Sequence, residues 1–228
     1  MSLKKTLERI QSRIDYAQKR GGFDHPVQLV AVTKTHPFST IEDCYKIGIT
    51  SIGENRIQES SQKFRSLDLM PNLKKRFIGK LQSNKVNKCL DMFDTIDSVD
   101  SFKLARRINA RAEYLGKKIP VLLEINTSGE TQKHGFTMEK MDEMLCCIDE
   151  SNLIVTGLMT LGPRTADKEK IRDSFIQLRK LKDSINRALN QPNLIDLSMG
   201  MSGDYEIGVE EGSTMVRIGT ALLGPRKK

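Results

Sequence analysis

The chain has 228 residues, of which 38% are hydrophobic and 29% charged, and its formal net charge is +8 at pH 7. This composition describes an ordinary soluble globular protein. No stretch approaches the roughly 18 consecutive apolar residues of a membrane span, and the first ten residues lack the apolar core of a signal peptide. We therefore expect a cytoplasmic protein without a membrane partner.

The cysteines and the positive charge point to no special class of protein. Cys44, Cys89, Cys146 and Cys147 show neither zinc-ligand spacing nor the density of a secreted disulfide scaffold. Net positive charge is a feature of nucleic-acid-binding proteins. Here, however, the lysines and arginines are spread along the chain, tryptophan is absent, and no recognised nucleic-acid-binding motif occurs. We predict a basic surface that attracts anionic small molecules, and no nucleic-acid partner.

Short apolar runs alternate with amphipathic segments along the whole chain. The apolar runs predict eight strands, at 27–33, 50–53, 75–79, 93–97, 119–125, 153–158, 194–197 and 215–218. The amphipathic segments predict a leading helix near 3–19 and further helices at 38–47, 55–65, 83–90, 101–115, 137–149, 167–189 and 204–211. Strands that alternate with helices imply right-handed βαβ units and a parallel sheet.

Eight strands predict closure into a single (β/α)8 TIM barrel, an α/β fold that takes about 200–250 residues. The helix near 3–19 is an extra N-terminal element, expected to pack outside the barrel or across its lower end, and the Gly21-Gly22 pair breaks it. No linker rich in Pro, Gly or Ser divides the chain. We predict one domain over residues 1–228, and a monomer, with a weak dimer as the alternative.

Lys34 ends the apolar run Leu29–Thr33, which is suited to a strand buried on both faces. A lysine at the exit of such a strand lies where α/β barrels place their chemistry. Partial burial lowers the pKa of an ammonium group and favours the neutral, nucleophilic amine. Lys34 is therefore a candidate for a Schiff base with a carbonyl compound. The alternative is a lysine that only extends its ammonium group to water at a strand end.

Polar and small residues also follow the other predicted strands. A capped βα turn explains any one of these segments, but all of them together, on the rim where Lys34 emerges, indicate a functional site. The segments are Gly53–Glu59, Ile78–Lys85, Asn126–Glu130, Lys133–Phe136 and Gly157–Leu161.

The last two loops predict a phosphate site. We expect Leu197–Asp204 to follow strand 7 and to run into a helix, and Gly219 and Thr220 to follow strand 8. Loops after strands 7 and 8 of a barrel frequently bind phosphate through backbone N–H groups. Ser202 and Thr220 can add hydroxyl donors, while Gly219 lets the backbone approach the oxygens closely.

An aldehyde-binding lysine beside a phosphate site describes a ligand that carries both groups, which fits pyridoxal 5′-phosphate. Arg217 lies two residues before Gly219, and its guanidinium is a candidate to face the pyridine nitrogen. A permanently charged arginine there keeps that nitrogen unprotonated and weakens the ring as an electron sink. A surface salt bridge is the alternative role for Arg217.

These segments resemble the pyridoxal phosphate homeostasis protein family, whose members are relatives of the N-terminal barrel domain of alanine racemase. The likeness extends from strand 1 to the last loop. The matching segments are Ala31–Lys34, Gly53–Asn55, Phe77–Lys85, Leu197–Ser202 and Val216–Thr220.

The resemblance implies roles for individual residues. Lys34 would carry the cofactor as an internal aldimine, Arg217 would face the pyridine nitrogen, and Asn55 would lie beside the ring. The phosphate would be held by Ser202, Gly219 and Thr220, and Met201, from the matching segment Leu197–Ser202, joins the cofactor-binding set. One departure is Arg76, where many relatives have a histidine; we expect it to alter a contact at the barrel wall or rim and to leave the cofactor anchors alone.

The racemases that share this barrel take a second base, a tyrosine, from a separate C-terminal domain of a partner subunit. Such a domain also closes the pocket against water. This sequence stops soon after the strand-8 loop, and only Tyr205 lies near the site in sequence. The resemblance therefore favours a protein that buffers or delivers pyridoxal phosphate, with apo-enzymes as acceptors, over a single-domain racemase of low activity that uses Lys34 as one base.

Overall fold

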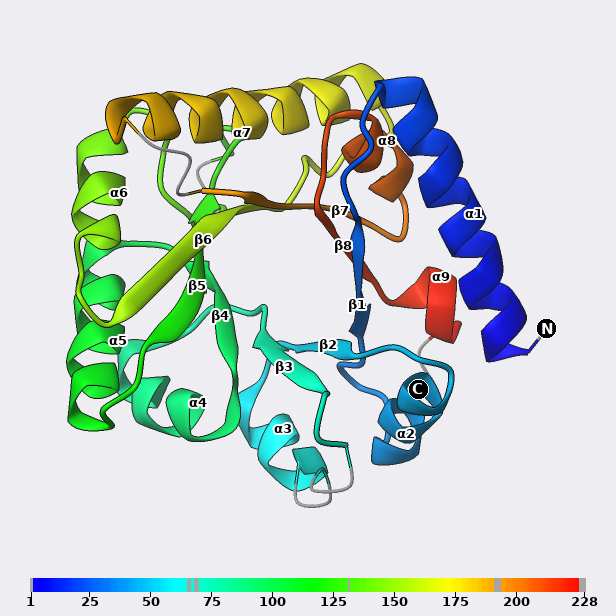
Figure 1. Ribbon diagram of the computed structural model, residues 1–228, viewed down its shortest axis with the longest axis horizontal. Coiled ribbons are helices and arrows are strands. Elements are labelled where there is room, and N and C mark those ends of the chain that lie inside the picture. Colours follow the sequence, from blue (N-terminus) through cyan, green and yellow to red (C-terminus); the bar gives the residue numbers. More distant parts are fainter. Residues whose placement is uncertain (1, 65–66, 68–69, 131, 191–193, 226–228) are drawn as a thin grey trace.

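The computed structural model describes residues 2–64, 67, 70–130, 132–190 and 194–225. Within them, eight strands form a closed parallel barrel in chain order, and Figure 1 shows helices around the outside of the strands. The predicted (β/α)8 barrel with an extra N-terminal helix is confirmed. The strands are β1 (Gln28–Val32), β2 (Ser51–Glu54), β3 (Lys74–Phe77), β4 (Thr95–Val99), β5 (Ile119–Ile125), β6 (Leu153–Thr160), β7 (Asp196–Met201) and β8 (Met215–Ile218).

Each helical segment predicted from the sequence corresponds to a helix, with ends that shift by up to a few residues. Residue 65, the predicted end of one helix, lies outside the described residues. The helices are α1 (Leu3–Gly21), α2 (Phe38–Lys46), α3 (Ile57–Lys63), α4 (Val86–Met92), α5 (Phe102–Tyr114), α6 (Met141–Ile148), α7 (Lys168–Ala188), α8 (Tyr205–Glu210) and α9 (Thr220–Leu223). A 3₁₀ turn (Ser83–Lys85) precedes α4, and no helix in the described ranges is long and apolar enough to cross a membrane.

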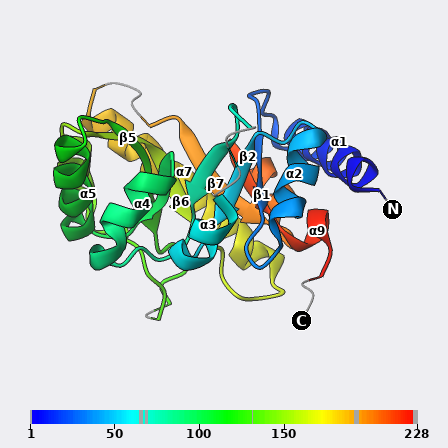
Figure 2. The ribbon, with the colours of Figure 1, turned by 90° about the horizontal axis from the view of Figure 1, so that it is seen from below.

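Pairing of β1 with β8 closes the barrel. In this register Val30 is opposite Arg217, and Ala31 is opposite Ile218. Because all the strands are parallel, their carboxyl ends meet at one rim. Figure 2 shows the loops after β5 and β6 on the lower side of the molecule, the side on which α9 also lies. The residues that follow β1 and β8 are therefore neighbours at this rim.

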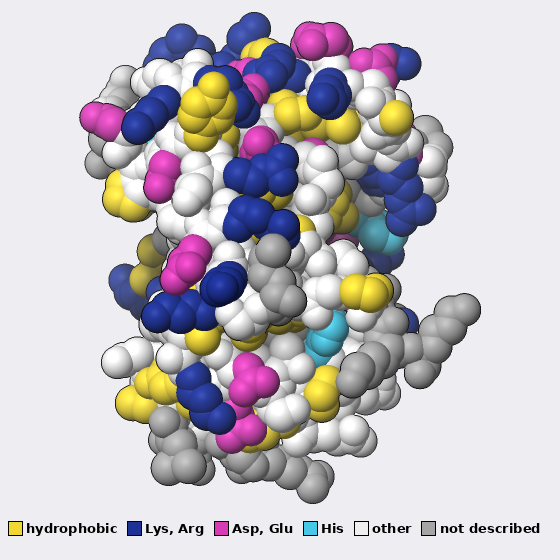
Figure 3. All heavy atoms as spheres, turned by 90° about the vertical axis from the view of Figure 1, so that its right-hand side faces the viewer, with side chains coloured by type: hydrophobic (Ala, Val, Ile, Leu, Met, Phe, Trp, Pro, Cys, Tyr) yellow, Lys and Arg dark blue, Asp and Glu magenta, His cyan; other side chains and the backbone are white. Residues whose placement is uncertain are grey.

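Helix α1 packs outside the barrel, against α8 and α9 (Figure 1). Its buried residues Ile10, Ile14 and Ala17 recur at helical spacing, and Arg13 forms an ion pair with Glu206 of α8. The helix ends at Gly21, and the next residue, Gly22, caps it with a φ of 75° in the left-handed region. Figure 3 shows that lysine and arginine side chains on this face of the molecule are interspersed with acidic ones.

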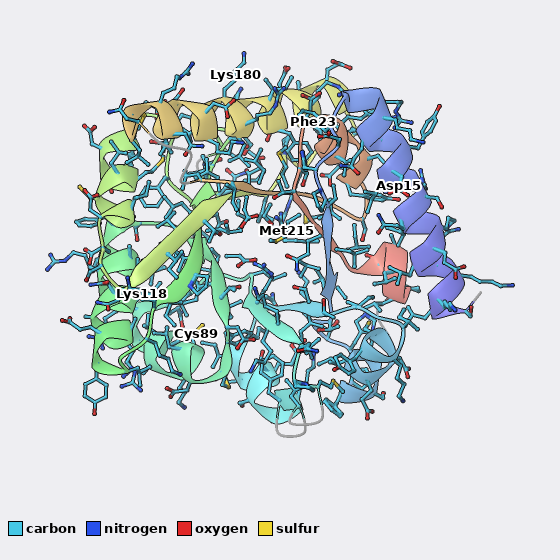
Figure 4. The ribbon with its side chains drawn as sticks, viewed as in Figure 1. Asp15, Phe23, Cys89, Lys118, Lys180 and Met215 are labelled. Carbon is cyan, nitrogen blue, oxygen red and sulfur yellow. The ribbon has the colours of Figure 1, made fainter. Side chains whose placement is uncertain are left out.

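The barrel interior is filled in layers. Val30, Leu122, Met159 and Met215 form an apolar cluster, and Figure 4 shows Met215 near the centre of the ring of strands. Side chains of a strand alternate between its two faces, so the residues two positions before and after Val30 share its inward direction. The apolar cluster thus separates polar groups at the amino ends of the strands from those at the carboxyl ends.

Arg76 lies in the polar layer at the amino ends of the strands, with 7% of its surface exposed. Its guanidinium donates to both carboxylate oxygens of Asp97 at 3.0 Å, to Gln28 Oε1 at 3.1 Å and to Ser51 Oγ at 3.2 Å. Thr95 Oγ1 donates to Asp97 Oδ1 at 2.8 Å. Arg76 is therefore part of a buried network inside the barrel and ties four strands together, rather than making a single contact at the wall or rim.

The expectation that Leu197–Asp204 follows strand 7 is wrong, because β7 itself extends to Met201. The small residues that suggest a loop belong instead to an irregular strand. The register with β8 shifts between Ser198 and Met201, and Gly200 between them has a φ of 98°. A Cβ atom on Gly200 would lie 2.8 Å from the Cα of Tyr205, so glycine lets α8 pack closely against the strand.

We expect Asp97→Asn to lower the free energy of unfolding by about 3–5 kcal/mol, because it leaves the Arg76 guanidinium buried without its charge partner. Urea denaturation monitored by circular dichroism measures this loss. The control is Glu143→Gln, which breaks the exposed Lys140–Glu143 pair and should change stability by no more than about 0.5 kcal/mol. Equal midpoints for the two variants would contradict a stabilising role for the buried pair.

Candidate functional site

A cavity of about 390 Å³ lies at the carboxyl end of the barrel. This volume is in the range of sites for small molecules. The residues that line the cavity include all seven that the sequence singles out: Lys34, Asn55, Met201, Ser202, Arg217, Gly219 and Thr220. The structure therefore brings these residues together, and their binding of a cofactor stays a prediction.

Lys34 lies at the cavity because every second residue of β1 faces the inside of the barrel, and Lys34 follows in this series. Val30 packs inside the barrel and Val32 lines the cavity. Lys34, two residues further along, lines the cavity as well and is half-buried. The strand direction thus places an amine at the edge of an enclosed space.

A buried ion pair holds the residue before Lys34. The hydroxyl of Thr33 donates to Glu54 Oε1 at 2.7 Å, and Lys63 Nζ donates to the same oxygen at 2.9 Å. Lys63 also donates to the main-chain oxygen of Thr33 at 2.9 Å. Burial raises the pKa of Glu54, while the hydrogen bonds from Thr33 and Lys63 act in the opposite direction. This contact attaches the end of β1 to α3.

The same cation holds the residue after Lys34 through Glu59. Lys63 Nζ donates to Glu59 Oε1 at 2.5 Å, and that oxygen also accepts the main-chain N–H of Thr35 at 2.5 Å. Thr35 has a φ of 67°, a left-handed conformation that a β-branched residue rarely adopts. The backbone is therefore fixed on both sides of Lys34.

Main-chain N–H groups converge on the opposite side of the β1–β8 seam. The N–H groups of Gly219 and Ala221 both donate to Ser202 Oγ at 3.2 Å, and Thr220 between them is exposed at the cavity edge. A Cβ atom on Gly219 would make only ordinary contacts with Val32, at 3.5 Å, so packing within the protein does not require a glycine there. Converging backbone N–H groups and hydroxyls are a donor set for phosphate oxygens.

Asp204 holds the turn that contains Ser202. Its Oδ1 accepts the main-chain N–H of Met201 at 2.5 Å. Burial raises the pKa of Asp204, and the hydrogen bond from Met201 partly opposes this shift. The turn is therefore closed by its own residues, which leaves the Ser202 hydroxyl directed at the end of β8.

Arg217 lies at the base of the cavity, with 3% of its surface exposed. One terminal nitrogen donates to the main-chain oxygen and to Oγ of Ser198, both at 2.7 Å, and the other donates to the main-chain oxygen of Thr160 at 2.7 Å. Burial lowers the pKa of Arg217, and three carboxylates oppose this shift: Asp97, Glu124 and Asp204. Arginine keeps its proton in proteins, so the cavity has a fixed cation at its base, and the surface salt bridge considered from the sequence is wrong.

Asn55 is positioned by a close approach of β3 to the end of β2. A Cβ atom on Gly79 would lie 2.5 Å from the main-chain oxygen of Asn55 and 2.7 Å from its Cβ. Only glycine fits at this distance, so the residue that follows β3 brings Asn55 to the cavity wall.

Glu124 is the main cavity residue that sequence reasoning missed. It lies on β5, lines the cavity and has 7% of its surface exposed. The pKa of Glu124 is raised to about 7; burial is the main cause and Asp100 adds to it, whereas Arg217 and Lys80 act in the opposite direction. The signal was present in the sequence, because Glu124 is the one ionisable residue in the apolar run 119–125.

Three more polar residues line the cavity: Lys80 and His134, which belong to rim segments predicted from the sequence, and His36, which the sequence did not assign to the site. Lys80 Nζ lies 3.1 and 3.2 Å from the two ring nitrogens of His134. This contact joins the loop after β3 to the loop after β5 across the mouth of the cavity.

Tyr205 lies near the site in sequence, but it does not line the cavity. Its side chain is 4% exposed and packs in the apolar cluster that includes Ile10 and Ile14 of α1. Gly200 allows the backbone of Tyr205 to lie close to β7. Among the described residues that line the cavity, none is a tyrosine.

Comparison with known proteins gives the family. Residues 6–227 match the model of the alanine racemase N-terminal domain. A pyridoxal phosphate homeostasis protein of Vibrio alginolyticus is 38% identical over 99% of this chain and 98% of its own length, and one of Aquifex aeolicus is 39% identical over 99% and 97%. The chain belongs to the pyridoxal phosphate homeostasis protein family.

Solved structures agree with this membership. PipY of Synechococcus elongatus, described with pyridoxal phosphate bound, is 32% identical to this chain, with a TM-score of 0.87. The match covers 98% of this chain and 100% of PipY. An alanine racemase of Clostridium difficile is 17% identical and has a TM-score of 0.73; the match covers 95% of this chain and 57% of the racemase. The racemase shares the barrel fold, whereas the homeostasis proteins match along the whole chain.

We expect Glu124→Gln to stabilise the protein more at pH 8 than at pH 4.5. Between its ordinary pKa of 4.5 and the folded-state pKa of about 7, the folded protein keeps a proton that the unfolded chain has lost, so stability falls as pH rises. Glutamine does not titrate, so the variant avoids this loss of stability. The gain reaches up to about 3 kcal/mol at pH 8. Urea denaturation at both pH values measures the difference.

The control for this prediction is Glu113→Gln, at an exposed position on α5. It should change stability by the same small amount at both pH values. A Glu124→Gln variant whose stability relative to the parent is independent of pH would show that Glu124 titrates normally.

Proposed function

We propose that this chain binds pyridoxal 5′-phosphate in the cavity at the carboxyl end of the barrel and acts in intracellular pyridoxal phosphate homeostasis, by buffering or delivery. The observation that carries the proposal is the convergence of Lys34, Arg217 and Ser202 on one cavity, with the Gly219 and Ala221 N–H groups directed at Ser202 Oγ. The names of the relatives, and the bound ligand described for PipY, support it.

The residues at the cavity fit the two ends of the ligand, its phosphate and its aldehyde. The phosphate would be held by the Gly219 and Ala221 N–H groups and the hydroxyls of Ser202 and Thr220, with Ser202 Oγ already at the point where the N–H groups converge. The ligand supplies an aldehyde, which condenses with a neutral amine to give an imine and water. Lys34 is the residue we propose for this Schiff base, because the ion cluster around Lys63 fixes its backbone.

Arg217 would face the pyridine nitrogen, with Asn55 and Met201 along the sides of the ring. The guanidinium is a donor that keeps its charge, so it would pair with an unprotonated ring nitrogen. An unprotonated pyridine withdraws electrons weakly. Arg217 would therefore favour stable retention of the cofactor over reaction at a bound amino acid.

This arrangement favours a carrier over a racemase. A racemase needs acid–base groups on both faces of its cofactor, and the tyrosine nearest to the site in sequence, Tyr205, is buried against α1. We propose that residues 1–228 act as one cofactor-binding domain in the cytoplasm, that apo-enzymes are the acceptors, and that turnover of amino acids is weak or absent.

We expect added pyridoxal phosphate to give the protein a visible absorption band that borohydride bleaches. Lys34→Ala should abolish the band, because it removes the amine that forms the imine. Lys80→Ala is the matched control, since Lys80 lines the same cavity and should leave the band in place. A parent spectrum that is unchanged by the ligand would overturn the proposed function.

We expect Thr220→Val to weaken retention of pyridoxal phosphate by roughly 1–3 kcal/mol, the value of a hydrogen bond to a charged oxygen. Equilibrium dialysis measures the loss. Pyridoxal, which has no phosphate, is the matched control and should bind the parent and the variant equally. A similar loss for both ligands would show that Thr220 does not contact the phosphate.

A further inference from the structure

A second cavity, of about 560 Å³, adjoins the one assigned to the cofactor. The two cavities share Lys34, Glu124, His134, Leu161 and Met201. The second cavity extends under the loops that follow β5 and β6, and its outer residues Gln132 and Arg164 are exposed. A small molecule can therefore approach Lys34 from this side without passing the residues proposed for the phosphate.

Glu124 stands at the boundary of the two cavities. Glu124 lines both cavities, and only 7% of its surface is exposed. A carboxylate removed from most of its water is stabilised by hydrogen-bond donors and by positive charge. A ligand with N–H donors in the second cavity would satisfy this carboxylate.

The charges around Glu124 come from several elements. Arg217 on β8 and Lys80 after β3 favour the carboxylate, while Asp100 after β4 disfavours it. Lys34 and His134 line both cavities with it. Within the second cavity Lys133 is already engaged, because it pairs with Glu130 at 2.6 Å and donates to Gly162 at 3.0 Å.

We propose that the second cavity admits a primary amine, and that Glu124 binds this amine and transfers its proton during release of the cofactor from Lys34. The inference rests on the proposed function, and it names the class of molecule that triggers release. The amine is either a free amino acid or a lysine side chain of an acceptor protein, two sources with the same reacting group.

The exchange is balanced without an oxidant or a reductant. Glu124 takes a proton from the incoming ammonium, and the neutral amine then adds to the carbon of the imine. The bond between this carbon and Lys34 Nζ breaks, and Glu124 returns the proton to the departing lysine nitrogen. A new imine to the incoming amine forms as Lys34 regains its free amine. General acid–base transfer of this kind needs a carboxyl group whose pKa is near the working pH.

The test measures release of pyridoxal phosphate from loaded protein by the decay of its visible band, with and without glycine. In the parent protein we expect glycine to accelerate release by about 10-fold or more. In Glu124→Gln the ratio of the two rates should fall towards one, whereas Glu113→Gln should keep the parent ratio. Nα-acetyl-lysine amide replaces glycine in a parallel series, and faster release by one amine than by the other identifies the source.

Two results would overturn the inference while leaving the proposed function intact. Either glycine and acetyl-lysine amide fail to accelerate release from the parent, or Glu124→Gln keeps the parent ratio. Absence of the visible band from the loaded parent would instead contradict the proposed function itself, and this inference with it.

A second measurement uses the protein without pyridoxal phosphate. The ¹³C resonance of the Glu124 carboxyl, assigned by its loss in Glu124→Gln, should shift when glycine is added, because the amine enters the cavity next to it. The resonance should also titrate with a midpoint near the value of about 7 set by burial. A resonance that does not respond to glycine would contradict amine binding at this residue.

Discussion

Parallel pairing of β1 with β8 is the interaction on which the site depends. These strands carry the two ends of the proposed ligand, since Lys34 follows the first and Gly219 follows the second. The register that places Val30 opposite Arg217 also sets the depth of the guanidinium below the lysine. Without closure the first and last strands would be the two edges of an open sheet, and amine, cation and N–H groups would not share a cavity.

Charge inside the barrel is organised around two buried arginines separated by an apolar layer. Arg76 is neutralised by Asp97 at the amino ends of the strands, whereas Arg217 is held by main-chain oxygens and the Ser198 hydroxyl. Burying a guanidinium is costly unless its donors are satisfied. The acceptors of Arg217 are neutral oxygens, so its charge stays available to a ligand, and Glu124 is a nearby carboxyl that lines the same cavity.

Much of the fold follows from patterns that are visible in the sequence. Eight apolar runs separated by helical periodicities predict the barrel, because parallel strands buried on both faces require apolar residues. The seven predicted site residues lie at strand ends, where the fold itself brings them together. The end of β7 was predicted too early, since glycine and serine in Ser198–Gly200 suggest a loop, and the bulge that accommodates them depends on pairing with β8.

Other features depend on tertiary contacts that no local pattern records. The direction of Tyr205 follows from the contact of α8 with Gly200 and α1. The network around Arg76 joins residues from four strands, and the cluster around Lys63 joins α3 to the end of β1. Glu124 could have been found, because a charged residue within an apolar strand is unusual.

The central claim is that the amine of Lys34 is the covalent anchor of the ligand. Mass mapping of peptides from protein loaded with pyridoxal phosphate and reduced with borohydride tests it most directly. The account predicts that the reduced pyridoxyl phosphate adduct is found on the peptide that contains Lys34. An adduct confined to other lysines of the cavity mouth, with the Lys34 peptide unmodified, would contradict it.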